Sequence, residues 1–142
     1  MLTMKVKLLS PHAVMPTKAH PEDAGIDLYA AARQHLYPRL CNKIPLDIAV
    51  EIPDGYCLVM KCRSSLAHLF TVEAGVIDAG YRGPLAVMMR LHGSLNGEPF
   101  LIQKGEKIAQ ALLLPVPPLN IIQVNELSST VRGQGGFGST GK

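Results

Sequence analysis

The chain has 142 residues, 47% of them hydrophobic, which excludes wholesale disorder and predicts one domain with a packed core. The formal net charge is +3 with no basic cluster, so duplex nucleic acid is disfavoured as a partner and a small anionic ligand is compatible. Cys41, Cys57 and Cys62 show no C-x-x-C spacing, which favours reduced thiols in an intracellular protein. A zinc site of Cys57, Cys62 and His68 matches no usual spacing, so core cysteines are the favoured interpretation.

The first ten residues, MLTMKVKLLS, carry Lys5 and Lys7 inside a short apolar run, which is not the pattern of a signal peptide. No stretch of the chain approaches the ~18 consecutive apolar residues that a membrane-spanning helix needs. We therefore expect no membrane segment and a cytoplasmic or nuclear location.

Short strands dominate the predicted elements. Prolines and glycines recur at short intervals, 11 and 13 in all, and leave little room for long helices. Apolar residues alternate with polar ones in the segment 46–52, which is typical of a half-buried strand. The pattern predicts further strands at 56–62, 84–91, 98–103 and 119–127. Turn residues between strands predict hairpins at 53–55 and 92–97.

Two segments are ambiguous. Helix formers fill 105–115 and favour a helix by propensity, but its apolar residues lie on both faces, which also suits a fully buried strand. The segment 63–70 is a helix candidate with Ser64 or Ser65 as its N-cap. Pro-rich 114–119 is expected to be stiff and extended. Many evenly spaced short strands indicate an all-β sandwich, jelly roll or barrel with at most one short helix.

The C-terminal stretch RGQGGFGSTGK (132–142) contains the glycine and lysine spacing of a phosphate-binding Walker loop. Such a loop needs a following hydroxyl residue and a helix whose N-terminus faces the phosphates. Neither follows Lys142, so we do not expect a Walker loop. Composition alone favours a mobile tail, in which glycines and a cation could still contact phosphate.

Four further stretches combine residue types unusually. AGIDLYAA (24–31) places Asp27 in an apolar strand, and CRSSLA (62–67) places an arginine beside two serines. GVIDAGYRG (75–83) places an aspartate and a tyrosine in an expected glycine-punctuated hairpin, and GEKIAQ (105–110) brings a glutamine into an apolar run. In this order and at these intervals, the four stretches and the tail closely resemble the five motifs of the homotrimeric dUTPases, from about residue 20 to residue 142.

The resemblance implies a β jelly roll that hydrolyses dUTP to dUMP and pyrophosphate with Mg²⁺, limiting uracil in DNA and supplying dUMP. It implies a homotrimer in which three subunits build each active site. Residues 1–118 would form the catalytic domain, 119–131 a crossover strand to a neighbouring subunit, and 132–142 a flexible arm that closes a site. The tail is then interpreted as a lid over the triphosphate.

The motif residues then receive specific roles. Asp78 would hold and activate the water that attacks the α-phosphorus, because water is a poor nucleophile near neutral pH. Asp27 would support a metal-bound water, with Mg²⁺ held mainly by the phosphates. The ring of Tyr81 would pack against the deoxyribose and leave no room for a 2′-hydroxyl. Considered alone, Asp27 is typical of a buried sheet aspartate and Tyr81 of a core residue at a strand end.

The remaining roles concern substrate binding. The resemblance implies that the uracil edge is read by the backbone of Gly75, Val76 and Ile77, and that phosphates are contacted by Arg63, Ser64 and Ser65. It also implies that Gln110 donates to the substrate, that Arg132 grips the γ-phosphate and that Phe137 stacks on uracil. Backbone and hydroxyl donors from the lid would come from Gly138, Ser139 and Thr140.

Two other functions remain open from the sequence. A related deaminase acting on dCTP needs a carboxylate aimed at the pyrimidine, and Glu73 is the one unexplained carboxylate near the expected base pocket. A catalytically idle binding protein of the same family is the other alternative, although every motif keeps its reactive group. The intact Tyr81 and Phe137 favour hydrolysis over both.

Overall fold

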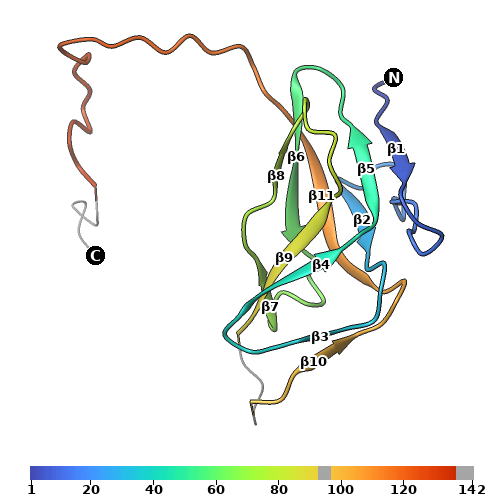
Figure 1. Cartoon of the computed structure of the whole chain (residues 1–142). Coiled ribbons are helices and arrows are strands. Elements are labelled where there is room, and N and C mark those ends of the chain that lie inside the picture. Colours follow the sequence, from blue (N-terminus) through green and yellow to red (C-terminus); the bar gives the residue numbers. More distant parts are fainter. Residues whose placement is uncertain (93–96, 137–142) are drawn as a thin grey trace.

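The computed structural model describes residues 1–92 and 97–136, which form an all-β body and an extended C-terminal segment (Figure 1). No helix occurs within these ranges. The eleven strands are β1 Lys5–Leu8, β2 Gly25–Tyr29, β3 Gln34–Leu36, β4 Cys41–Pro45, β5 Ile48–Glu51, β6 Tyr56–Cys62, β7 Phe70–Val72, β8 Val76–Asp78, β9 Ala86–Leu91, β10 Phe100–Ile102 and β11 Lys107–Pro115. The predicted all-β class is confirmed.

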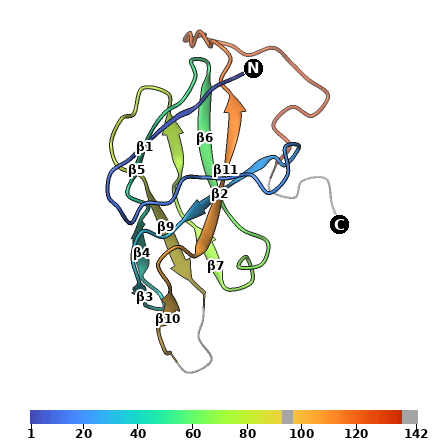
Figure 2. The same cartoon turned by 90° about the vertical axis from the view of Figure 1, so that its right-hand side faces the viewer.

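The strands form four antiparallel sheets around one core, in a jelly-roll arrangement. The largest has the order β2-β11-β6-β8, and a second has the order β4-β9-β7. Of two further ribbons, β1-β5 lies along one side of the body and β3-β10 at its lower end (Figure 2). Apolar side chains from both larger sheets and both ribbons meet in the interior, with Phe70 packed edge-on against Phe100. Burial of this cluster supplies most of the stabilisation of the fold.

β11 resolves the ambiguity at 105–115 in favour of a strand. It pairs with β2 on one side and with β6 on the other, so its backbone polar groups are satisfied by two neighbours. Ile108, Ala109 and Ala111 are fully buried within it. Pairing and burial on both faces therefore outweigh the helix propensity of this segment.

Several sequence predictions need correction. The helix candidate at 63–70 is a run of turns, in which the amide of Leu66 donates to Arg63 and that of Phe70 to Leu66. The strand predicted at 119–127 is absent, because this stretch finds no partner within the described part of its own chain. Residues 46–52 do not form one strand: β4 ends at Pro45, Asp47 has a positive φ of 52°, and β5 starts after it.

The predicted hairpins are also wrong in their pairing. β5 and β6, which flank the turn at 53–55, belong to different sheets. β8 lies within 75–83 and β9 is the next strand, and these two strands also belong to different sheets. The turns at these places cross between sheets, as a jelly roll requires. Most of the hairpin turn predicted at 92–97 lies outside the described residues.

The C-terminal segment, residues 116–136, leaves the end of β11 and extends away from the body (Figures 1 and 2). Its last backbone hydrogen bond to the body joins the amide of Val116 to the carbonyl of Gly55 at 2.7 Å. Ile121 is 84% exposed and Leu127 88% exposed. This apolar surface has no cover from the described residues of its own chain.

A membrane-spanning helix is absent from the described ranges, where no helix is long and apolar enough to qualify.

Candidate active site

Two pockets contain the residues that the sequence singles out. The first, here called the β8 pocket, has a volume of about 290 Å³. It is lined by Lys43, Val76, Ile77, Asp78, Tyr81, Pro84, Leu85, Ala86 and Met88. A carboxylate, a phenol ring and an apolar floor therefore share one concave site, which suits a ligand with a flat apolar part and a reacting polar part.

The approach to the β8 pocket depends on unusual backbone. Ala74 and Gly75 have positive φ values of 58° and 116°, which turn the chain into β8. The carbonyl of Gly75 accepts a hydrogen bond from the amide of Met60 at 2.8 Å. A Cβ at Gly75 would lie 2.9 Å from the Cβ of Met60, so both the conformation and the contact require glycine here.

Asp78 ends β8, where it pairs across the ladder with Cys57 of β6, and its side chain is exposed. The chain then turns, and the amide of Tyr81 donates to the carbonyl of Asp78 at 3.0 Å. This turn brings both side chains to the same pocket. The structure thus places Val76, Ile77, Asp78 and Tyr81 around one pocket, with Gly75 directly before β8.

The second pocket, here called the β2 pocket, has a volume of about 430 Å³. Its lining residues are Ala19, Asp23, Ala24, Gly25, Asp27, Arg63, Ser64, Lys107 and Gln110. Four of the predicted residues therefore meet here, from β2, β11 and the turn after β6. Cations, a hydroxyl and carboxylates in one polar cavity suit a phosphorylated ligand and its counterion.

Asp27 is the electrostatic centre of the β2 pocket. Its side chain is only 15% exposed, and its Oδ2 accepts a hydrogen bond from Lys107 Nζ at 2.7 Å. Its Oδ1 lies 3.3 Å from Arg63 Nε. The hydrogen bond to Asp27 raises the pKa of Lys107 above its usual value, because the carboxylate favours the charged ammonium.

Lys107 was missed by the sequence reasoning. It stands opposite Tyr29 in the β2–β11 ladder, and its ammonium lies 5.9 Å from the centre of the Tyr29 ring. The available signal was a single cation at the start of an apolar strand, in the same motif as Gln110. Only the strand register brings that cation to Asp27.

Gln110 and Arg63 each donate one hydrogen bond to a backbone carbonyl of the protein. Gln110 Nε2 donates to the carbonyl of Cys62 at 3.1 Å, and Arg63 Nη1 donates to the carbonyl of Lys107 at 3.3 Å. A Cβ at Gly25 would lie 2.2 Å from Gln110 Oε1, so glycine there makes room for the amide. These contacts fix both side chains at the rim of the pocket. Ser65 is exposed and lines neither pocket.

The two pockets are far apart on one chain. Asp27 of β2 stands opposite Gln110 of β11, which in turn stands opposite Lys61 of β6. Asp78 of β8 stands opposite Cys57, four residues before Lys61 on the same strand β6. Three strand steps and four residue positions therefore separate Asp27 from Asp78 in the sheet. At the usual strand spacings, this offset corresponds to roughly 20 Å.

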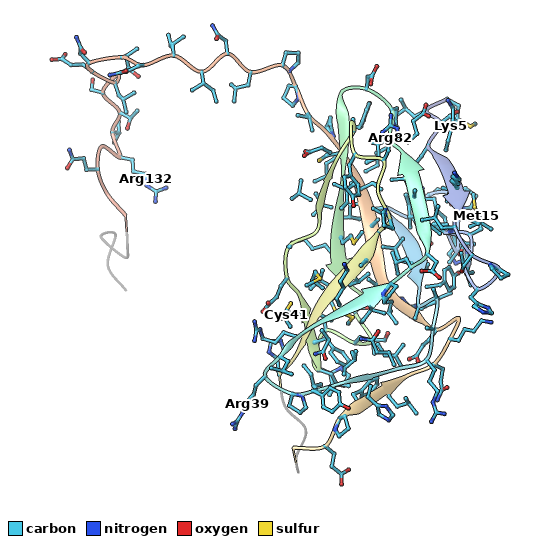
Figure 3. All side chains as sticks on the ribbon, in the orientation of Figure 1. Lys5, Met15, Arg39, Cys41, Arg82 and Arg132 are labelled. Atoms are coloured by element: carbon cyan, nitrogen blue, oxygen red, sulfur yellow. The ribbon has the colours of Figure 1, made fainter. Side chains whose placement is uncertain are left out.

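The tail residues are distant from both pockets. Arg132 is exposed on the C-terminal segment, away from the body, and its Nε donates to the carbonyl of Gly135 at 3.0 Å (Figure 3). The other predicted lid residues, Phe137, Gly138, Ser139 and Thr140, lie outside the described residues.

Glu73, which the sequence leaves unexplained, forms an ion pair with Arg90 of β9. Arg90 Nε and Nη2 both donate to its carboxylate, and the distance from Arg90 Nη2 to Glu73 Oε2 is 2.9 Å. The hydrogen bond from Arg90 lowers the pKa of Glu73 below its usual value. Glu73 does not line the β8 pocket. Its role visible in the structure is therefore to tie the loop before β8 to the neighbouring sheet.

Known proteins resemble this chain over nearly its whole length. The dUTPase family model matches residues 11–141. The deoxyuridine 5'-triphosphate nucleotidohydrolase of Clostridium tetani (strain Massachusetts / E88) is 40% identical over 144 residues, covering 99% of this chain and 97% of that protein. Its namesake from Arabidopsis thaliana is 41% identical over 139 residues, covering 96% of this chain and 82% of that protein.

Solved structures show the same fold. The dUTPase of Staphylococcus bacteriophage 80alpha with dUPNHPP superposes with a TM-score of 0.88 at 34% identity, covering 99% of both chains. A mutant dUTPase from phage phi11 of S. aureus, described for its coordination of a structural Mg(II) ion, gives 0.78 at 31% identity and covers 87% of this chain and 97% of that one. The fold is that of the jelly-roll nucleotide hydrolases. The chain belongs to the dUTPase family.

Proposed function

We propose that this chain hydrolyses dUTP to dUMP and pyrophosphate in active sites that the copies of a homotrimer build together. The observation that carries the proposal is the division of the required groups between two pockets. Asp78 and Tyr81 line one pocket, and Arg63, Ser64 and Asp27 line the other, roughly 20 Å away in the same sheet. A water-activating carboxylate and the phosphate-binding groups have to meet on one triphosphate. They can do so when one copy supplies the β8 pocket and another the β2 pocket.

The β8 pocket would bind the nucleoside and supply the nucleophile. The Tyr81 ring packs against the deoxyribose, and the backbone of Gly75, Val76 and Ile77 reads the uracil edge through its N–H and C=O groups. Asp78 accepts a proton from the attacking water, which then displaces pyrophosphate in line at the α-phosphorus. Mispaired polar groups disfavour a cytosine amine at this edge.

The β2 pocket would bind the phosphates. The Arg63 guanidinium and the Ser64 hydroxyl are suited to phosphate oxygens. Among the described residues, no three His, Cys, Asp or Glu side chains cluster closely enough to hold a metal by themselves. Both oxygens of Asp27 already face cations, so its carboxylate would contact a metal through water, and phosphate oxygens would hold the ion. When bound, Mg²⁺ offsets the charge that develops on the phosphates.

Two assignments in this region stay predictions. Gln110 would donate to the substrate with the amide hydrogen that its bond to Cys62 leaves over. Ser65 would add a second hydroxyl to the phosphate site once a copy of the chain covers it. Neither contact is made within the described residues of one chain.

The C-terminal segment would complete the site. Its exposed apolar residues support a crossover of 119–131 onto a neighbouring copy, with 1–118 as the catalytic body. Residues 132–142 would then close over the nucleotide, with Arg132 on the γ-phosphate and Phe137 on the uracil. Gly138, Ser139 and Thr140 would supply donors at the phosphates, and closure would exclude water.

The cellular role that follows is removal of dUTP, which limits uracil incorporation into DNA and supplies dUMP for dTTP synthesis. The dCTP deaminase alternative loses its main support, because Glu73 pairs with Arg90 and lines no part of the β8 pocket.

A pyrophosphate-release assay on dUTP, UTP, dCTP and dTTP, with and without Mg²⁺, tests the proposed function. We expect rapid release from dUTP with Mg²⁺, and slow release from the other nucleotides or without the metal. Ammonia release from dCTP would instead support the deaminase. Failure to release pyrophosphate from dUTP would contradict the proposal.

A further inference from the structure

The Tyr81 ring is held in place by the turn that follows β8. Its Oη donates to the carbonyl of Pro84 at 3.2 Å, and its amide donates to the carbonyl of Asp78 at 3.0 Å. Arg82 Nη1 donates to the carbonyls of Tyr81, at 3.0 Å, and Ala79. The Pro84 carbonyl is available because β9 begins only at Ala86. The backbone and the ring of Tyr81 are thus held by hydrogen bonds from groups within residues 78–84.

Gly83 adds a steric condition. A Cβ on this residue would lie 2.3 Å from Tyr81 Oη and 2.5 Å from its Cζ, whereas real Cβ contacts are essentially never closer than 3.0 Å. The backbone itself does not call for glycine, because Gly83 is not among the glycines with positive φ. Glycine is therefore required at position 83 because the Tyr81 ring occupies the space that a Cβ would take.

We propose that Gly83 is a positioning residue that sets the selectivity of the site for deoxyribose over ribose by fixing the Tyr81 ring. This inference rests on the proposed function and deepens it. Discrimination by excluded volume needs a wall that does not yield to one extra hydroxyl. A tyrosine side chain has two rotatable bonds, so its ring resists displacement only when other groups hold it. Contact with Gly83 and the hydrogen bond to Pro84 hold it against the pocket.

The variant Gly83→Ala tests this role. The new methyl group displaces the ring and breaks its hydrogen bond to Pro84, so the ring can yield to a 2′-hydroxyl. We expect the ratio of kcat/KM for dUTP to kcat/KM for UTP to fall by at least about tenfold, the lower end of the range for one small group in a pocket. Folding should be retained, since the nearest atoms are at the end of a side chain.

Gly80→Ala is the matched control. Gly80 lies in the same turn, has no positive φ, and a Cβ there would meet nothing within 4 Å. Its dUTP-to-UTP ratio should equal that of the wild type. Thermal midpoints of both variants, measured alongside, should stay close to the wild-type value.

A second variant separates ring placement from general damage. Tyr81→Phe keeps the ring and removes only its bond to Pro84, so the ratio should fall in the same direction. The double variant with Gly83→Ala should lose less selectivity than the two single losses combined, because both act through the same placement of the ring. If turnover is too low in a variant, the ratio of Kd values for non-hydrolysable dUTP and UTP analogues gives the same comparison.

The outcomes are distinguishable. A wild-type chain that prefers dUTP, with an unchanged ratio in Gly83→Ala, would overturn this inference and leave the proposed function standing. A wild-type chain that hydrolyses neither nucleotide would overturn both.

Discussion

At the scale of single residues, Asp27 and Asp78 have different environments, and the difference suits them to different roles in catalysis. Asp27 is largely buried and has a cation at each oxygen, so its carboxylate already takes part in two charged contacts. Asp78 is exposed at the β8 pocket and pairs with no cation in the part of the chain that the structure describes. Of these two aspartates, Asp78 is the one whose carboxylate makes no charged contact with a described residue, which suits it to accept a proton from a substrate water.

Replacing Asp78 with Asn tests that assignment. The amide keeps the shape of the side chain but is a poor proton acceptor, so kcat should fall by about 10²–10⁴-fold while nucleotide binding persists. Asp54→Asn, at an exposed turn outside both pockets, is the control and should keep wild-type turnover. Steady-state kinetics and a binding titration with dUTP measure both properties. Near wild-type turnover in Asp78→Asn would remove this residue from the mechanism.

The Glu73–Arg90 pair predicts a pH-dependent contribution to stability. Arg90 lowers the pKa of Glu73 below its ordinary 4.5 in the folded protein, so the contribution is present above about that pH and is lost as the pH falls through the lower folded value. Cys41 and His92 are the other titratable groups that act on this carboxylate. The thermal midpoint of Glu73→Gln should lie below that of the wild type at pH 7, and the two should converge under strongly acidic conditions. A gap that stays constant down to such pH would contradict the ion-pair account.

At the scale of elements, the sequence pattern located several of the strands. The prediction of a strand at 56–62 matches β6, and those at 84–91 and 98–103 contain β9 and β10. Propensity could not decide between helix and strand for 105–115, because pairing with β2 and β6 is what makes it a strand. The helix expected at 63–70 failed because a possible cap and a few helix formers do not outweigh the tertiary turn there.

The C-terminal segment carries a prediction at this scale. No residue between Pro115 and the end of the described chain at residue 136 belongs to the buried core cluster, so a chain truncated after Val131 should fold with a thermal midpoint close to that of the full-length protein. Its dUTP hydrolysis should nevertheless be nearly lost, since the proposed lid is missing. Circular dichroism and the pyrophosphate assay measure the two properties side by side. Normal hydrolysis by the truncated chain would exclude the lid.

At the scale of the whole molecule, the motif residues divide into two groups. The motif resemblance indicated four of the nine residues that line each pocket, but it did not show which of them share a pocket in one chain. The register of β2, β11, β6 and β8 settles that question and also brings Lys107 to Asp27. Gly83 emerges from its contact with the Tyr81 ring, and the relevance of both residues depends on contacts rather than on residue type. Residues that act together across copies cannot be grouped by the fold of one copy.

Complementation between two inactive variants tests the shared site most directly. Asp78→Asn disables the β8 pocket and Arg63→Gln disables the β2 pocket, and each variant alone should be nearly inactive. Equal amounts, unfolded together and refolded into mixed oligomers, should recover about a quarter of wild-type dUTP hydrolysis, because half of the copies supply each intact pocket and assembly is random. Recovery no greater than the sum of the separately refolded variants would contradict an active site built from different copies.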